Sequence, residues 1–244
     1  MTVNLDKTKV VHFRPGPKTP CTSCNITYGN NRIQFVKQNR YLGLTLNEFL
    51  DFSVTSKYVA KAAHRALGLL IAKSKAYGGL PFHTFQKLYD SLVQPIIDYG
   101  AGIWGTQSFS WINSVQHRAE RFYLGLGKYV PNNALQGEMG WRNPEARNWI
   151  SVCHLWLRLL QMDSPRLNCA IFEWAKNEST QVKNTWCGKV KNFLKGIGMG
   201  HACRRSEYID PKSIIQDITK IIDLMYAQKW TTAINSSSSK TGQG

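Results

Sequence analysis

Acidic residues are scarce in this sequence. Its 244 residues include 15 Asp and Glu against 31 Lys and Arg, so the formal net charge is +16 at pH 7 with histidine neutral. The sequence also lacks any apolar run of 18 or more residues, which excludes a membrane-spanning helix. The first nine residues contain no apolar stretch of signal-peptide length. We therefore expect an intracellular protein, in the nucleus or the cytoplasm, with no membrane partner.

Cysteine is also sparse. Six cysteines are too few for a disulfide scaffold of this length, and without a secretion signal we expect reduced thiols. Cys21 and Cys24 have the spacing of half a zinc site. The plausible second half, His201 with Cys203, has the wrong spacing and lies far away in the sequence. We predict a loop with two free thiols and no metal site.

The composition is that of a folded chain with a basic surface. Hydrophobic residues make up 43% and aromatic residues 11%, too much apolar side chain for a disordered basic tail. Residues 1–100 carry 13 basic and 5 acidic groups, which is half of the excess charge. A basic surface on a folded chain favours a polyanionic partner, nucleic acid first, although it also serves solubility alone.

The first fifty residues have strand patterns. Val10–Phe13 is a short apolar run, and residues 26–28 and 33–36 flank Gly29–Arg32, whose Gly and Asn favour a hairpin turn. Residues 40–46 alternate apolar and polar side chains and predict one further strand. Strands this short cannot bury both faces unaided, so we expect an exposed sheet edge and non-specific self-association.

After residue 51 the periodicity becomes helical, most clearly over residues 54–76. One face of this helix collects the apolar side chains Val59, Ala62, Ala63, Ala66, Leu67 and Leu70. Lys57, Lys61 and Arg65 recur every four residues on the opposite face, with about 6 Å between steps. This cationic stripe is suited to phosphate contacts, but a solvated helix face gives the same pattern.

Helical spacing continues to the end of the chain. We predict further helices over residues 82–99 with an interruption near Pro95, and over 108–128, 145–162, 166–178, 185–195 and 214–230. The tryptophans on apolar helix faces are predicted to be core residues and not base-stacking groups: Trp104, Trp111, Trp141, Trp149, Trp156 and Trp174. The predicted fold class is α+β, mostly α: a small N-terminal antiparallel β element followed by a multi-helix array.

One family resemblance covers essentially the whole chain. Asn4–Phe13, then a hairpin, then Arg40–Leu46 resemble, in order and spacing, the end of the palm in reverse transcriptases of non-LTR (LINE-like) retrotransposons. Leu88–Tyr89 followed by Pro95, Tyr99–Gly100 and Trp104 resembles their thumb. The resemblance implies end-of-palm strands over 1–50, a thumb-like helical domain over 51–130 and a C-terminal helical region over 131–235. The polar composition from Ser236 onward, which is typical of a linker, predicts a flexible tail over 236–244.

The resemblance also implies roles for individual residues. Tyr41, Leu42 and Gly43 match the primer grip, a hairpin that positions the 3′ end of the primer; otherwise they are an ordinary edge strand. Lys7 matches a lysine that in some polymerases is proposed to protonate the leaving pyrophosphate, although lysine near a strand is common.

The thumb of such enzymes follows an RNA–DNA template–primer duplex. Lys57, Lys61 and Arg65 are therefore expected to contact its phosphates in the parent protein.

The catalytic residues of that family are missing. Such polymerases hold two Mg²⁺ ions on palm aspartates that include an Asp-Asp pair, and no Asp-Asp dipeptide occurs here. By family order the pair is expected upstream of Asn4, with Met1 an internal start. We therefore expect no catalytic residues, no cofactor in this chain with Mg²⁺ only in a complete polymerase, and no activity of the chain alone. The alternative is a decayed or repurposed helical protein-interaction module without nucleic-acid function.

Overall fold

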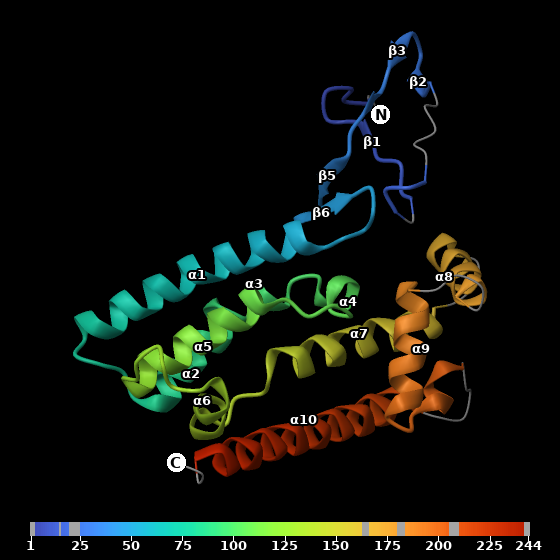
Figure 1. Ribbon diagram of the computed structural model, residues 1–244. Coiled ribbons are helices and arrows are strands. Elements are labelled where there is room, and N and C mark those ends of the chain that lie inside the picture. Colours follow the sequence, from blue (N-terminus) through green and yellow to red (C-terminus); the bar gives the residue numbers. More distant parts are fainter. Residues whose placement is uncertain are drawn as a thin grey trace. The chain divides into compact units, whose positions relative to one another are not determined.

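The structure is a computed structural model (Figure 1). It describes residues 3–14, 16–19, 25–162, 166–179, 184–204 and 210–241, with side chains up to Asn235. The chain divides into two compact units, Met1–Lys61 and Ala62–Gly244. Helix α1 (Ser53–Ala76) begins in unit 1 and continues into unit 2.

Unit 1 is built from three short strand pairs. The strands are β1 (Lys9–Val10), β2 (Thr27–Tyr28), β3 (Asn31–Arg32), β4 (Gln34–Phe35), β5 (Gln38–Tyr41) and β6 (Leu44–Asn47). Two pairs, β2–β3 and β5–β6, are antiparallel. A hairpin follows residues 26–28 as predicted, but its partner strand is β3, inside the predicted loop Gly29–Arg32, and not residues 33–36, because β4 pairs with β1 instead. The third, β1–β4, is parallel, because the long excursion of the chain between these strands returns it in the same direction.

The prediction of one strand over residues 40–46 is wrong. The chain reverses at Leu42 and Gly43, so β5 and β6 form a hairpin in which Tyr41 faces Leu44. Alternating apolar residues on both sides of a two-residue turn give the same sequence pattern as one uninterrupted strand. The hairpin that the resemblance implied for this region is present.

Arg14 fastens the N-terminal segment to the end of β6. Its backbone N–H donates to the Glu48 carbonyl at 2.8 Å, and its guanidinium donates to the Glu48 carboxylate at 2.6 and 2.9 Å. A third guanidinium bond, at 2.6 Å, reaches the Thr19 carbonyl. Both side chains of the Arg14–Glu48 pair are largely buried, so their bonds are shielded from solvent.

Unit 2 consists of helices. After α1 come α2 (Phe82–Leu92), α3 (Gln94–Asp98), α4 (Ala101–Trp104), α5 (Ser110–Leu124), α6 (Asn132–Met139), α7 (Pro144–Leu160), α8 (Leu167–Glu178), α9 (Trp186–Gly196), the 3₁₀ helix η1 (Gly200–Cys203) and α10 (Pro211–Thr241). The mostly helical fold class and the interruption near Pro95 are confirmed. Helix α6 was not predicted, and α10 continues past Asn235 into the segment predicted as a tail. None of the helices in the described residues combines the length and apolar character needed to cross a bilayer.

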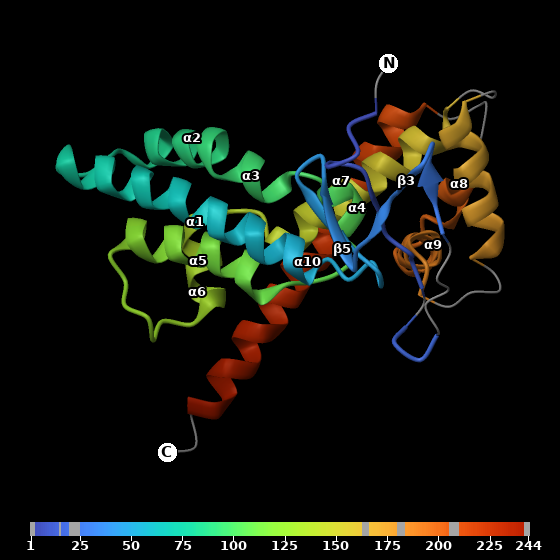
Figure 2. The same ribbon diagram turned by 90° about the horizontal axis from the view of Figure 1, so that it is seen from above.

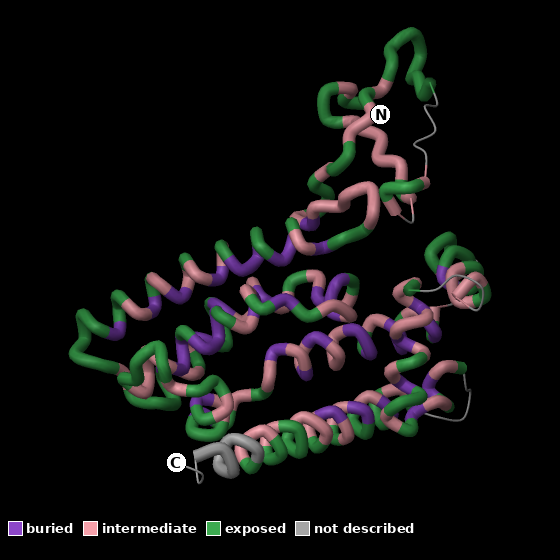
Figure 3. The backbone as a smooth tube through the Cα atoms, viewed as in Figure 1, coloured by how far each residue is buried: buried purple, intermediate pink, exposed green. Residues whose placement is uncertain are grey.

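Helices α7, α8, α9 and α10 and η1 enclose one apolar core. Figure 3 shows buried positions along α7 and on one side of α10, which pack against each other. Trp156 is fully buried there and its indole N–H donates to the Ala202 carbonyl at 3.0 Å.

The prediction of Trp174 as a core residue is wrong, since this side chain is 65% exposed. The buried residue of α8 is Phe172, so the side of the helix that carries Trp174 lies outside the core.

Buried side chains also lie in the part of α1 in unit 2 and in helices α2, α4 and α5. Leu67, Phe85, Tyr89, Trp104 and Val115 are each at most 1% exposed. The centre of the Phe85 ring lies 5.0 Å from that of Tyr123 and 5.8 Å from that of Phe122, so α2 packs against α5. Helices α5 and α6 contact each other in the same part of the unit, as Figure 2 shows from above.

Candidate nucleic-acid interface

The turn of the β5–β6 hairpin has an unusual backbone. Leu42 has a φ of 46° and Gly43 a φ of 83°, the pair of positive values typical of a type I′ turn. Glycine adopts such angles freely, whereas an L-residue with a side chain is less stable there by about 1–2 kcal/mol. Leucine at this position is therefore held by the rest of the hairpin and is not favoured by its own conformational preference.

Two large side chains lie at the tip of this hairpin. Tyr41 is 64% exposed and Leu42 is 71% exposed. These two consecutive exposed side chains make the tip of the hairpin apolar, and an apolar surface can contact a sugar or a base. Gly43 next to them has no side chain, so a ligand can approach the backbone closely.

The hairpin is joined firmly to the start of α1. The Thr55 hydroxyl accepts a hydrogen bond from the Thr45 backbone N–H and donates one to the Thr45 carbonyl, both at 2.8 Å. Thr55 is 1% exposed. The guanidinium of Arg40 also lies 4.3 Å above the ring of Tyr58. These contacts fix the hairpin relative to the first turns of α1, which belong to the same unit.

Sequence reasoning missed Thr55. A threonine near the start of a helix is common, and its usual partner is a carbonyl of its own helix. Only the hairpin, which the strand pattern did not predict, brings Thr45 within reach. The fold therefore had to be known before this contact could be found.

The cations of α1 lie where the helical pattern predicted. Lys57, Lys61 and Arg65 are all exposed. Val59 and Ala63, on the opposite face, are at most 5% exposed. Lys57 and Lys61 lie in the part of α1 that belongs to unit 1, together with the hairpin, and Arg65 lies in the part that belongs to unit 2. Unit 1 thus carries the apolar tip of the hairpin and two of the three cations in the stripe along α1.

Lys7 lies in a separate turn. The Asn4 side chain accepts the Lys7 backbone N–H at 3.2 Å, and the Thr8 hydroxyl donates to the Asn4 carbonyl at 2.8 Å. The Asn-x-x-Lys-Thr stretch is therefore a hydrogen-bonded turn that leads into β1 and leaves Lys7 exposed. Asn4 and Thr8 have a structural role, and only Lys7 is available for chemistry.

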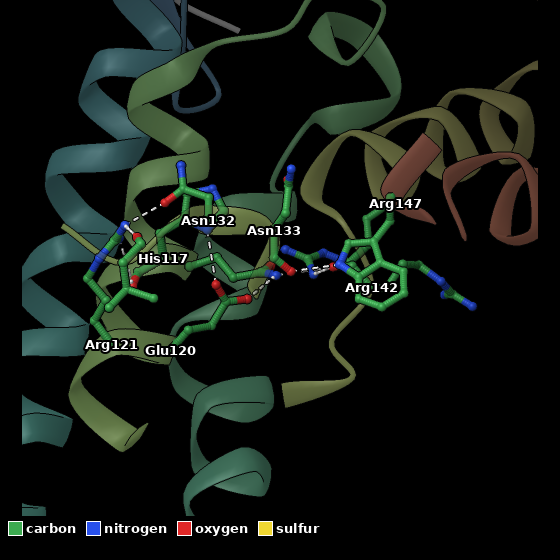
Figure 4. A network of polar contacts seen from close by, with 10 residues as sticks. His117, Glu120, Arg121, Asn132, Asn133, Arg142 and Arg147 are labelled. Atoms are coloured by element: carbon green, nitrogen blue, oxygen red, sulfur yellow. Dashed lines mark hydrogen bonds and ion pairs between the residues drawn. The ribbon is translucent and has the colours of Figure 1, made fainter. Parts of the chain in front are cut away.

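Polar side chains in unit 2 form a buried network, drawn in Figure 4. The fully buried Glu120 carboxylate pairs with the His117 ring at 3.0 Å and accepts from the Gln116 amide at 2.8 Å. The Gln116 amide also donates to the Arg142 carbonyl at 3.3 Å, as Arg147 does at 2.7 Å. This network links α5 to the segment before α7, so we assign it to the scaffold.

Cys153 is a core residue of α7. Burial raises the pKa of its thiol to about 12, so it stays protonated and unreactive at neutral pH. In the described part of the chain no group of three or more His, Cys, Asp or Glu side chains could hold a metal ion. Cys21 and Cys24 lie outside the described residues, so their prediction as free thiols stays a prediction.

The candidate nucleic-acid-binding residues therefore fall into two places, and all of them belong to unit 1 except Arg65, which lies further along α1 in unit 2. The hairpin tip and the start of α1 form one continuous element, and Lys7 lies in its own turn. The element offers apolar contacts and fixed positive charge, which suit a polyanion with sugar and base surfaces. No family model, no curated protein and no solved structure matches the chain.

Proposed function

We propose that this chain is the primer- and template-binding portion of an RNA-directed DNA polymerase of the non-LTR retrotransposon class. It would comprise the end of the palm, the thumb and a following helical region, and it would not polymerise DNA alone, because its sequence has no Asp-Asp pair. A location in the nucleus or the cytoplasm is part of the same proposal, since template–primer duplexes are made there.

One observation carries the proposal. A hairpin with an exposed apolar tip is hydrogen-bonded through Thr55 to a helix whose opposite side carries regularly spaced cations. A primer terminus presents an apolar sugar and base surface next to its phosphates. An element that offers both apolar contacts and positive charge can bind the base and sugar of the primer end together with its phosphates. A row of cations that serves only solubility needs no apolar hairpin tip beside it.

The proposed roles follow from this geometry. Tyr41 and Leu42 contact the last nucleotide of the primer, with Gly43 allowing close approach. Lys57 and Lys61, and Arg65 further along α1, neutralise successive phosphates of the duplex. Lys7 is proposed only as the remnant of a proton donor, because its turn is not tied to the hairpin by any contact described above.

The test is the salt dependence of binding to an RNA–DNA duplex. Replacing Lys57, Lys61 and Arg65 by Gln removes three phosphate contacts and is expected to reduce the slope of log K against log salt by about 2 to 3. The matched control replaces Lys87, Lys212 and Arg158 by Gln, three exposed residues of other helices with the same total charge. Equal slopes for both triple variants, or no binding by the wild type at about 50 mM salt, would refute the proposal.

A second measurement addresses the hairpin tip. Tyr41→Ala is expected to weaken binding of a duplex with a recessed primer 3′ end by about tenfold, and of a blunt duplex without an accessible terminus much less. Equal loss for both duplexes would contradict a role at the primer end. Trp174→Ala serves as the control, because it also removes an exposed aromatic side chain.

The alternative function, a helical protein-interaction module, has one observation in its favour. Leu167, Ile171 and Trp174 are exposed at helical spacing on α8, at 76%, 54% and 65%. An interaction module is expected to bind no duplex at low salt, so the same titration separates the two candidates.

A further inference from the structure

A basic hollow lies among α8, α9 and η1 in unit 2. Its volume is about 690 Å³, within the range of ligand-binding pockets. Its lining residues are Lys176, Lys191, Lys195, Gly200, His201, Cys203 and Arg204. These lining residues include three lysines, an arginine and a histidine, and none of them is acidic.

The protein itself fixes two of these cations. The Lys191 ammonium donates to the Lys176 carbonyl at 2.6 Å and to the Ser179 hydroxyl at 2.9 Å, which leaves one of its three N–H groups for another acceptor. The Lys176 ammonium pairs with Glu173 at 2.7 Å and lies 5.7 Å from the centre of the Phe172 ring. Both ammonium groups thus have defined positions at the hollow.

Cys203 also lines the hollow, near three of its cations. Burial raises the pKa of this thiol, while Lys195, Lys191 and Arg204 act in the opposite direction. Three positive charges are therefore close enough to act on one sulfur atom. Lys195, His201 and Arg204 are exposed and accessible to a ligand.

The positive charges at the hollow repel one another. Glu173, which pairs with Lys176, neutralises only one of these charges. An anion with several charges removes this repulsion and fills the hollow. Phosphate groups match best, because Arg donates to two phosphate oxygens at once and Lys supplies a point charge. We propose that this hollow binds phosphate groups, either those of an RNA strand or those of a free polyphosphate.

The inference goes beyond the proposed function. The hollow lies entirely in unit 2, and its lining residues belong neither to the β5–β6 hairpin nor to α1. A chain that binds no template–primer duplex could still bind phosphate here. The two proposals therefore fail independently.

The experiment compares two double variants of the full chain. Lys195→Gln with Arg204→Gln removes two exposed cations of the hollow, and Lys87→Gln with Arg158→Gln removes the same charge from exposed positions on α2 and α7. The probes are inorganic tripolyphosphate and a 16-nucleotide single-stranded RNA, with affinity measured by calorimetry for each.

We expect the hollow variant to bind at least one probe about ten- to hundredfold more weakly than the control variant. A loss for RNA alone identifies a strand as the source of the phosphates, and a loss for both probes or for tripolyphosphate alone identifies the phosphate groups themselves. Equal affinities of the two variants for both probes overturn the inference.

A melting experiment guards against misfolding. Tripolyphosphate is expected to raise the melting temperature of the wild type and of the control variant, because a ligand of the native state stabilises it. The hollow variant is expected to fold and to lose this increase. If its melting temperature rises as much as that of the control variant with tripolyphosphate and also with the RNA, the phosphates bind elsewhere and the inference is wrong. The salt dependence of duplex binding by the Lys57, Lys61 and Arg65 triple variant is measured in parallel. That titration tests the proposed function alone, so a failure of either proposal can be recognised separately.

Discussion

Thr55→Val is predicted to loosen the β5–β6 hairpin from α1. Valine has nearly the shape of threonine but no hydroxyl, so the N–H and the carbonyl of Thr45 both lose the partner that they have at 2.8 Å. Leaving such buried groups unpaired costs about 1–3 kcal/mol. With two groups affected and partial access of water, we expect the opening free energy of the hairpin to fall by about 2–3 kcal/mol.

Hydrogen exchange is the suitable assay. All eight tryptophans of the chain lie at position 104 or beyond, so indole fluorescence reports on unit 2 and not on the hairpin. The amides of residues 38–47 are expected to exchange roughly 30- to 150-fold faster in Thr55→Val, since each 1.4 kcal/mol is a factor of ten.

Thr55→Ser is the matched control, because it keeps the hydroxyl and removes only a methyl group. Its hairpin amides are expected to exchange nearly as slowly as those of the wild type. If Thr55→Val also exchanges at the wild-type rate, the two hydrogen bonds do not hold the hairpin, and the rigid element on which the proposed function depends does not exist.

Two further perturbations concern unit 2. Burial, and to a smaller extent the Arg118 guanidinium, lower the pKa of His64 in the folded protein below 6.5. The contribution of the neutral ring to the free energy of unfolding is therefore complete above pH 6.5. It is lost as the pH falls through the pKa of His64 in the folded state. Denaturant titrations followed by tryptophan fluorescence should show less acid destabilisation in His64→Gln; an unchanged pH profile would contradict this. Gly137→Ala would place a Cβ 2.6 Å from the Trp230 ring, and we expect a loss of about 1–3 kcal/mol. Gly196→Ala, where no atom lies within 4 Å of the new Cβ, is the control, and equal stabilities would refute the packing argument.

The sequence predicted those features that depend on periodicity alone. The apolar face of α1, with Val59 and Ala63 buried, follows from the 3.6-residue period, and so does the exposure of Lys57 on the other side. The interruption near Pro95 follows from the missing N–H of proline. These signals are local, and no distant part of the chain is needed to read them.

Features that depend on distant partners could not be predicted in this way. The reversal at Leu42 was missed because leucine rarely adopts a positive φ, and the contacts that hold it there come from the rest of the fold. The exposure of Trp174 was missed because a helical apolar pattern does not tell whether a neighbour covers it. The candidate residues accordingly stay a prediction from the sequence, and the contact through Thr55 that joins the hairpin to α1 was not predicted.

The position of α10 has a consequence for synthesis on the ribosome. Ile218 and Ile222 complete the core of α7 to α9, and Trp230 donates to the Asn133 carbonyl nearly a hundred residues earlier in the chain. Until α10 has left the exit tunnel, the apolar face of α7 that it covers stays open to water and to other chains. At about 5–20 residues per second this interval lasts seconds, long enough for chaperones to bind the nascent chain.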